Sequence, residues 1–313
     1  KAWYGFFSLP AAAQMSALLV IIVFAVIIIE QHMRQKMQFT QSGRLSMEEE
    51  RIELTGIIRW AATFFASAVL LIAFFIPFVQ LVIWSANVFH EEFSRRYLEI
   101  LGNSLFFACL ATAIITGCSL ILSYAQRRHS DKTMQLLVRI STLGYALPGT
   151  VLAVGIFIVI SRADSLLGGM IRAVSGLDGG ALMQGTAVTV IAAYMVRFMA
   201  AGFNPVSSAM NRITPSLDEA SISMGVTGIS LLRRVHLPIL RSGLFTAAML
   251  VFVDVMKEMP ITLMTRPFGW DTLAVKIFEL TSEGEWERAA LPAVAIVLGS
   301  LLPIIIFTKK TET

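Results

Sequence analysis

Long apolar runs recur along the chain, and shorter polar segments separate them. Each run approaches the ~20 residues that a helix rising ~1.5 Å per residue needs to cross a hydrocarbon core ~30 Å thick. The pattern therefore predicts membrane-spanning helices joined by polar loops. The predicted spans are 9–29, 60–84, 102–124, 136–160, 184–204, 243–263 and 288–308.

The composition also favours lipid as the solvent. Of 313 residues, 56% are hydrophobic and only 15% are charged. That is more apolar surface than one soluble core of this length could bury. The basic residues behind the net charge of +4 are scattered between apolar runs, not gathered into a stripe with aromatics, so no nucleic-acid partner is expected. The sequence predicts an all-α integral membrane protein whose surroundings are the lipid bilayer.

The distribution of basic residues predicts the orientation. If the loops alternate between the two sides, those on the side of residues 30–59 hold most of the 25 Lys and Arg residues. Cytoplasmic loops carry such an excess. We therefore predict that this side, and the carboxyl end of the chain with it, is cytoplasmic.

Residues 30–58 divide the first predicted span from the other six. The segment is polar, mixed in charge and without an apolar stripe, which is typical of a linker on the cytoplasmic side. The chain begins with Lys1, and no cleavable signal pattern precedes the first span. We therefore expect this sequence to be a segment of a longer protein.

The loop 205–242 contains the most informative pattern, TPSLDEASISMGVTGISLLRRVHLPIL. Ser216 and Glu219 are spaced as a capping box, which predicts a short helix running to about residue 224. Gly225 is placed where a glycine relieves a left-handed turn at the end of a helix. A second amphipathic turn, 229–235, is expected to stop before Leu237-Pro238. The loop should form a rigid elbow lying along the membrane.

At this point the sequence resembles the cytoplasmic signature of ABC-importer permeases, Glu-Ala-Ala, three residues, Gly, nine residues, Ile, one residue, Leu-Pro. All spacings are kept, with two conservative departures, Ser for Ala and Val for Ile. The resemblance implies a coupling loop that docks into the ATPase partner. The corresponding residues are Glu219, Ala220, Ser221, Gly225, Val235, Leu237 and Pro238.

Three further stretches, 145–155, 194–200 and 251–293, are similar to ferric-iron permeases, which commonly fuse two six-helix halves. The resemblance implies a type I ABC-importer permease fold: a six-helix core plus one preceding transmembrane helix. Residues 1–29 would be the last transmembrane helix of a preceding half, 30–58 the linker and 59–313 the six-helix permease domain. Importers for thiamine, phosphonates and polyamines share much of this pattern.

The same resemblance implies the surroundings of the chain. The bacterial inner membrane is the implied location. The implied partners are ABC ATPase subunits, a periplasmic substrate-binding protein, and the other permease half, whether in the same chain or as a second copy. Ferric iron is the expected cargo.

Charged residues stand within the predicted span 243–263, where ionised groups are costly and usually face protein or water. Asp254 and Glu258 would share one helix face, and Fe³⁺ prefers oxygen ligands. One hypothesis is therefore that both carboxylates line the translocation path. The alternative is that Asp254 and Lys257 neutralise each other at i, i+3 while Pro260 ends the helix.

Pro148 and Gly149 interrupt the predicted span 136–160. Proline cannot complete the helical hydrogen-bond ladder, so a kink is expected there. The kink could serve as a gate hinge, or it could only assist packing, for which Gly144 and Gly155 would also allow close approach. Arg197 is expected to snorkel toward the cytoplasm, without a transport role.

Motifs for other chemistry are missing. No phosphate-binding loop occurs, so ATP would be used by the partner subunit, and no cofactor is expected on this chain. We do not predict an enzyme, nor a firmly assigned metal site. An ion-coupled secondary transporter stays as the alternative class, because intramembrane carboxylates suit both an ABC permease and an ion-coupled carrier.

Cys109 and Cys118 are too far apart on one helix for a disulfide. All four histidines are read as isolated surface residues: His32, His90, His129 and His236.

Overall fold

The computed structural model describes residues 54–129, 131–175 and 182–311, together with isolated helical positions between 14 and 29. Most of the predicted first span and the predicted linker up to residue 53 lie outside the described residues. Within the described ranges every regular element is a helix. The all-α prediction is confirmed for this part of the chain.

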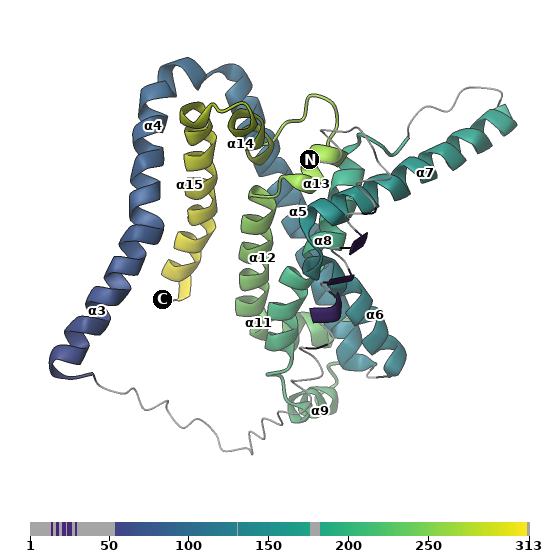
Figure 1. The fold of residues 1–313 in the computed structure, drawn as a ribbon. Helices are drawn as coiled ribbons and strands as arrows, with labels where there is room; N and C mark the ends of the chain where they lie inside the picture. Colours follow the sequence, from purple (N-terminus) through teal and green to yellow (C-terminus); the bar gives the residue numbers. More distant parts are fainter. Residues whose placement is uncertain are drawn as a thin grey trace.

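The first fully described span is one long helix, built from α3 (Gly56–Leu70), a π turn (Leu71–Phe75) and α4 (Ile76–Glu92). No residue of α3 is buried, although the helix is strongly apolar. Figure 1 shows this helix at one side of the molecule, where α4 runs beside α15 (Trp286–Thr311). An apolar surface exposed in this way is typical of a helix that faces lipid or another membrane helix.

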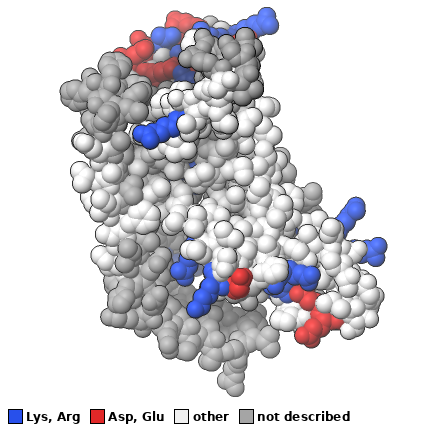
Figure 2. All heavy atoms as spheres, turned by 90° about the vertical axis from the view of Figure 1, so that its right-hand side faces the viewer, with Lys and Arg blue, Asp and Glu red and all other residues white. Residues whose placement is uncertain are grey.

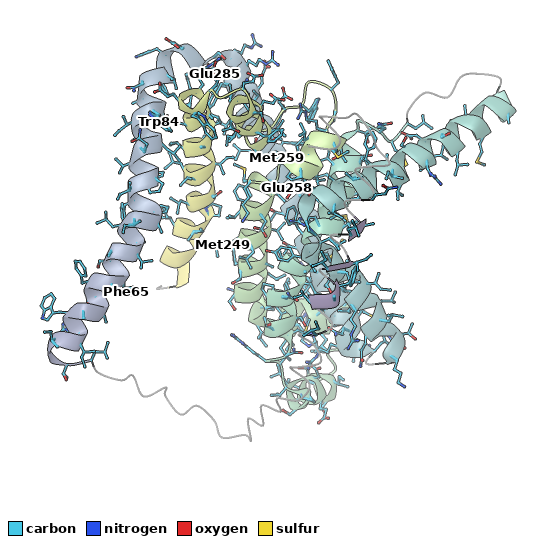
Figure 3. The ribbon with its side chains drawn as sticks, in the orientation of Figure 1. Phe65, Trp84, Met249, Glu258, Met259 and Glu285 are labelled. Carbon is cyan, nitrogen blue, oxygen red and sulfur yellow. The ribbon has the colours of Figure 1, made fainter. Side chains whose placement is uncertain are left out.

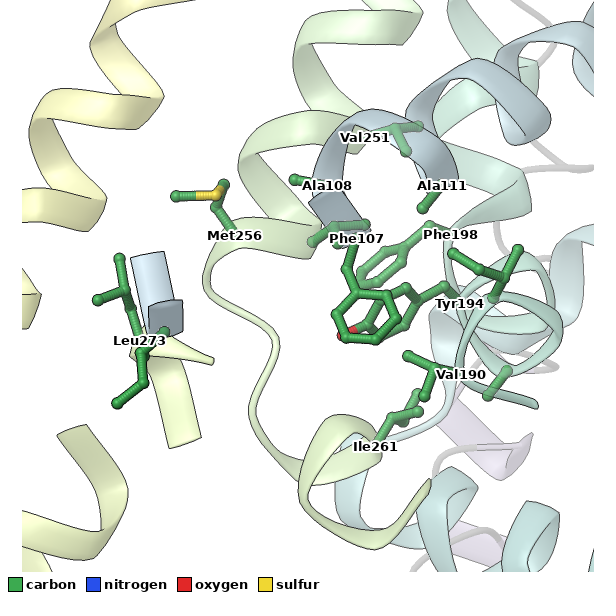
Figure 4. Packing of buried hydrophobic residues seen from close by; sticks show 14 of the residues in the cluster. Phe107, Ala108, Ala111, Val190, Tyr194, Phe198, Val251, Met256, Ile261 and Leu273 are labelled. Atoms are coloured by element: carbon green, nitrogen blue, oxygen red, sulfur yellow. The ribbon is translucent and has the colours of Figure 1, made fainter. Parts of the chain in front are cut away.

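Three helices form the centre of the bundle: α5 (Arg95–Arg128), α8 (Ala187–Met210) and α12 (Arg241–Met256). Their buried faces meet around Phe107, Tyr194 and Val251 (Figure 4). A Cβ added at Gly202 would lie only 2.7 Å from the Ser119 hydroxyl oxygen. Small residues therefore let these helices approach closely, as is common between membrane helices.

The predicted span 136–160 is wrong in its bounds. The structure has α6 (Lys132–Thr142), a 3-10 turn (Leu143–Ala146) and then a separate helix α7 (Gly149–Ser175). Pro148 lacks the N–H that a continuous helix would need, and its ring disfavours a helical residue before it. Leu147 is accordingly extended. The helix of span length starts at Gly149, so the apolar run is divided at its proline.

The predicted span 243–263 is also interrupted. Helix α12 ends at Met256, and α13 (Pro260–Thr265) begins after a break. Proline is at the first position of α13, where its missing N–H costs nothing. The predicted spans 60–84, 102–124, 184–204 and 288–308 correspond to continuous helices with somewhat different ends.

A bent element precedes α12. Helices α10 (Gly228–Leu231) and α11 (Leu237–Ile239), joined by a π turn (Leu232–His236), form one arm, which meets α12 at 74°. The described residues contain five helices long and apolar enough to cross a membrane, or six if this bent pair is one span. The count equals that of the predicted six-helix core only when the bent pair is taken as one span.

The polar segments lie at two opposite ends of the bundle. The start of α3, the α5–α6 turn and α9 (Pro215–Ser223) lie toward one end in Figure 1, and α14 (Leu273–Ser282) lies toward the other. The face that carries α6 and α7 shows charged residues mainly near these ends, with a largely uncharged belt between them (Figure 2). This distribution suits a protein that crosses a bilayer.

Candidate functional site

The elbow, defined here as residues 214–240, begins at a helix start that differs in detail from the prediction. Thr214 is the N-cap of α9 and Pro215 its first residue, and no side-chain cap hydrogen bond forms. The Ser216 hydroxyl is 3.0 Å from that of Thr214, so the predicted capping box is wrong. Proline sets the first helical position through its fixed φ, which displaces the cap by two residues.

The turn after α9 is as predicted. Gly225 adopts φ +80°, and its N–H donates to Ile222 O at 2.9 Å. This left-handed conformation strains any residue with a Cβ. The glycine is therefore required by the turn between the two arms.

The second arm does not stop before Leu237-Pro238, as the sequence analysis expected. It continues through the π turn to Ile239. A π turn widens the hydrogen-bond ring, so the proline ring is accommodated without ending the helix. The elbow is thus two helical arms joined at Gly225.

The signature residues lie mostly on the surface of the elbow. Ser221 is buried and donates to Leu217 O at 2.7 Å, while Val235 is partly buried. The other five are exposed, and apolar side chains stand beside them: Ile222, Met224 and Ile229. The exposed signature positions are Glu219, Ala220, Gly225, Leu237 and Pro238.

Side chains missed by the sequence analysis hold the elbow to the bundle. Arg127, in the last turn of α5, donates to Asp218 Oδ2 from Nη2 at 2.6 Å and from Nε at 3.1 Å. Its Nη1 donates to the carbonyls of Ile213 at 2.9 Å and Met210 at 3.3 Å. One guanidinium thereby joins three segments, since its planar donors suit several acceptors at once.

His236 is not a lone surface residue, as predicted, but is only 1% exposed. A hydrogen bond joins its Nε2 to Asp218 Oδ1 at 2.8 Å, which ties one arm of the elbow to the other. Burial raises the pKa of Asp218, but the hydrogen bonds from His236 and Arg127 and the Arg127 charge outweigh it and bring that pKa below its ordinary value. His90 and His129 are exposed, as predicted, and His32 lies outside the described residues. Cys109 and Cys118 are free, as predicted.

A second polar region lies where two interrupted helices meet, at the Leu147-Pro148 break before α7 and the 257–259 break before α13. A Cβ added at Gly149 would lie 3.4 Å from the Pro260 ring and 3.5 Å from Glu258 Oε1. The two breaks are therefore in close contact. Figure 3 shows Glu258 and Met259 at the turn between α12 and α13.

Arg197 of α8 connects the two breaks. Its Nη1 donates to the carbonyl of Leu147, and its Nε lies 3.9 Å from Glu258 Oε2. The expectation that it snorkels toward the cytoplasm is wrong, because the break before Pro148 leaves a carbonyl without a helical partner, and the guanidinium binds it. The buried Arg197 Nε makes no hydrogen bond within the described residues, so the contact with Glu258 is loose.

The two candidate carboxylates do not share a helix face, because α12 ends between them. Asp254 pairs with Lys257 Nζ at 2.8 Å and accepts from the Tyr145 hydroxyl at 3.3 Å. Glu258 accepts from the N–H of Ile261 at 3.1 Å and so caps α13. The structure thus forms the Asp254–Lys257 pair that was given as the alternative, and Pro260 begins a new helix.

The glycines around the second region divide into two kinds. A Cβ at Gly144 would lie 1.9 Å from the carbonyl oxygen of Val196, so the predicted close approach is confirmed there. Gly155 has open space around it, and the same prediction for it is wrong.

Lys257 and Met259 line a groove of about 420 Å³ against α14 and α15. Within the described residues, no His, Cys, Asp and Glu group of metal-binding size occurs.

The fold and these two regions define a class: an all-helical membrane protein with interrupted spans and an elbow on its surface. Residues 111–309, well over half of the chain, match the family described as binding-protein-dependent transport system inner membrane component. The chain belongs to this family, which comprises permease subunits of ABC importers and places it in an inner membrane.

Relatives and solved structures agree with this assignment. The chain is 23% identical over 313 residues to the Fe(3+)-transport system permease protein FbpB 2 of Haemophilus influenzae, a match that covers 97% of this chain and 58% of that protein. It is 27% identical over 258 residues to a putative 2-aminoethylphosphonate transport system permease protein of Salmonella typhimurium, covering 78% and 91%. The chain thus spans little more than half the length of the Haemophilus relative.

A solved bacterial alginate ABC transporter in complex with a periplasmic protein gives a TM-score of 0.63 at 15% identity, covering 80% of this chain and 92% of that one. A second alginate transporter structure gives 0.63 at 14% identity, covering 82% and 95%. At these identities the likeness shows the fold alone. The predicted ABC-importer permease fold is confirmed.

Proposed function

We propose that this chain forms the substrate path of an ATP-driven importer and receives the motion of an ATPase partner through its elbow. The observation that carries the proposal is the exposed signature on two helical arms, attached to the bundle by Arg127. A rigid, exposed element fixed to membrane helices can convert a push from a soluble subunit into helix movement. The chain uses no ATP itself.

The exposed side of the elbow fits such a contact chemically. Met224 is 75% exposed and Ile229 83%, and Glu219 of the same elbow is also exposed. Apolar anchors next to a charge are typical of protein–protein interfaces, and methionine adapts to the surface that covers it. This surface lies at the end of the bundle that the positive-inside rule makes cytoplasmic, and the carboxyl end would be cytoplasmic with it.

Co-purification with the ATPase subunit after mild detergent extraction tests the elbow. The Glu219→Lys variant is expected to lose the partner, because it reverses the charge at an exposed signature position. The matched control is Glu91→Lys, an exposed glutamate at the opposite end of the bundle. Uptake in proteoliposomes driven by an ion gradient without ATP would overturn the proposal in favour of a secondary transporter.

Ferric iron is the proposed cargo, on the support of the Haemophilus relative and the carboxylates at the interrupted helices. Transporter sites often lie where broken helices meet in the membrane. A trivalent cation would compete with Lys257 for Asp254 and with Arg197 for Glu258. Lys257 is 63% exposed and so can leave the Asp254 carboxylate readily. The Pro148-Gly149 break would act as the hinge that opens this meeting point.

A phosphonate is the second candidate, because the Salmonella relative matches over 91% of its own length and Arg197 supplies a cationic group at the same point. Arginine binds such oxyanions through several donors at once. The two cargoes therefore rely on opposite charges of one region.

Uptake assays with radioactive ferric iron and with 2-aminoethylphosphonate separate these cargoes in a preparation containing the binding protein and ATPase of the same system. The double variant Asp254→Asn, Glu258→Gln should abolish iron uptake while membrane abundance stays constant. Normal iron uptake by that variant would reject the carboxylate path. Uptake of the phosphonate alone would reject iron as cargo and leave the elbow mechanism standing.

A further inference from the structure

Helix α5 contacts the elbow at one end and the segment before α14 in its other half. Near its last turn, Arg127 and Tyr124 reach the elbow, and in its first third Asn103 and Ser104 reach the segment before α14. The separation of Ser104 from Arg127 along the helix corresponds to about 35 Å at 1.5 Å per residue, roughly the thickness of a hydrocarbon core.

The contacts at the elbow end are short and several. Arg127 binds Asp218 of the first arm and two carbonyls at the end of α8. Tyr124 reaches the second arm, where its hydroxyl donates to Gly228 O at 3.5 Å and its ring lies 5.9 Å from that of His236. The elbow is therefore attached to α5 through both of its arms.

The contacts at the other end are formed with main-chain groups. Asn103 Nδ2 donates to Asp271 O at 3.2 Å, and the N–H of Leu273 donates to the Ser104 hydroxyl at 2.8 Å. Arg266 pairs with the Asp271 carboxylate at 3.0 Å and holds the same segment. Main-chain contacts fix the position of a segment more firmly than contacts between mobile side chains.

We propose that α5 transmits motion between the elbow and the 266–273 segment, and that Arg127 is the positioning residue that makes α5 move with the elbow. The inference rests on the proposed function, because it concerns how the elbow acts once an ATPase partner holds it. Between its ends α5 packs its buried side against α8 and α12 around Phe107, Ala111 and Ile115. A rigid helix held at both ends shifts as a unit.

The test uses the complete transporter, with its ATPase subunits and cargo-loaded binding protein. In the Arg127→Met variant, ATP-dependent uptake and the stimulation of ATP hydrolysis by loaded binding protein should each fall by roughly tenfold, a usual size for coupling between distant sites. Co-purification with the ATPase should persist, because the exposed signature is unchanged. Arg127→Lys should restore part of the stimulation, since lysine keeps the charge facing Asp218 but cannot bind two carbonyls as well.

The matched control is Arg128→Met, which removes an exposed arginine from the same turn and should couple like the wild type. Loss of abundance and assembly in parallel with uptake would make Arg127 merely structural and overturn the inference. A Ser104→Ala variant tests the other end. If α5 is the connection, the Arg127→Met, Ser104→Ala double variant should lose no more ATP-dependent uptake than Arg127→Met alone. Effects that multiply would reject a single connection.

The wild-type preparation separates the two proposals. If it neither retains an ATPase nor takes up cargo with ATP, the proposed function fails. If it does both and Arg127→Met remains fully coupled, only the inference about α5 fails.

Discussion

At the elbow and at the meeting point of the interrupted helices, an arginine joins segments of the chain, but the two arginines are bound with different tightness. In each, an arginine from a neighbouring helix donates to main-chain carbonyl oxygen beside a helix end, and each arginine also faces a carboxylate. At the elbow the Arg127–Asp218 contact is 2.6 Å, whereas Arg197 and Glu258 are 3.9 Å apart. A short, doubly bonded pair holds its segments together, and a looser pair can exchange partners. The difference suits transmission of motion at the elbow and opening of the path within the membrane.

The largest expected effect comes from removing the guanidinium at the meeting point. Arg197→Met leaves Glu258 and the Leu147 carbonyl without that partner in a buried setting, and losing one member of a buried pair costs about 3–5 kcal/mol. Thermal unfolding in detergent should show the loss, together with low membrane abundance. The control is Arg162→Met, an exposed arginine of α7. Equal stability of the two variants would show that the looser pair contributes nothing.

A somewhat smaller effect is expected where α8 passes the 3-10 turn. Gly144→Ala places a methyl group 1.9 Å from the Val196 carbonyl oxygen, which forces the backbone to shift. Overpacking of this kind costs about 1–3 kcal/mol. Gly155→Ala adds the same methyl group in open space and should be neutral or slightly stabilising. Unfolding midpoints of the two variants compare them directly, and a neutral Gly144→Ala would contradict the close approach.

At the elbow the turn itself can be changed without touching Arg127. Gly225→Ala must hold alanine at φ +80°, at a cost of about 1–2 kcal/mol for a left-handed residue with a Cβ. The expected result is weaker ATPase co-purification with little change in bundle stability, because the strain is confined to the turn. Gly117→Ala, in the middle of α5 with open space around it, is the control. Unchanged co-purification would mean that the two arms need not be fixed in relation to each other.

The smallest expected effect is a pH dependence of the stability that the Asp218 contacts contribute. Because the folded-state pKa of Asp218 is below its ordinary value of 3.8, its contacts contribute stability above that value, and the contribution is lost as the pH falls through the lower folded pKa. Asp218→Asn should therefore be less stable than the wild type at neutral pH, and the difference should shrink only below about pH 3.8. Unfolding midpoints across this range measure it. If the stability difference between wild type and Asp218→Asn disappears between pH 7 and 5, the pH dependence comes from a group other than Asp218.

The sequence predicted what depends on local pattern. Apolar runs located the four uninterrupted spans between residues 54 and 311, and the signature spacing located the elbow and the left-handed Gly225. Helix interruptions were only partly predicted. The proline at 148 indicated a kink, and the alternative interpretation had Pro260 end a helix, but α12 already ends at Met256 and Pro260 begins α13.

Contacts between distant residues could not be predicted from one sequence. Arg127 and Asp218 are 91 residues apart, and Arg197 and Leu147 are 50 apart. Arg197 and His236 were therefore misread as side chains directed to the surface, since their partners come from other helices. The one available signal for Arg197 was its place inside a predicted span, where ionised side chains usually face protein or water.

The long first helix, Gly56–Glu92, has 37 residues. At 1.5 Å per residue it is about 55 Å long, well beyond a hydrocarbon core of about 30 Å. A rod of this length must lean in the bilayer or extend into the water beyond it, and its lean follows the thickness of the lipid. The angle of this helix is therefore a property of the membrane as much as of the protein, and lipids of different chain length would change it without any change in sequence.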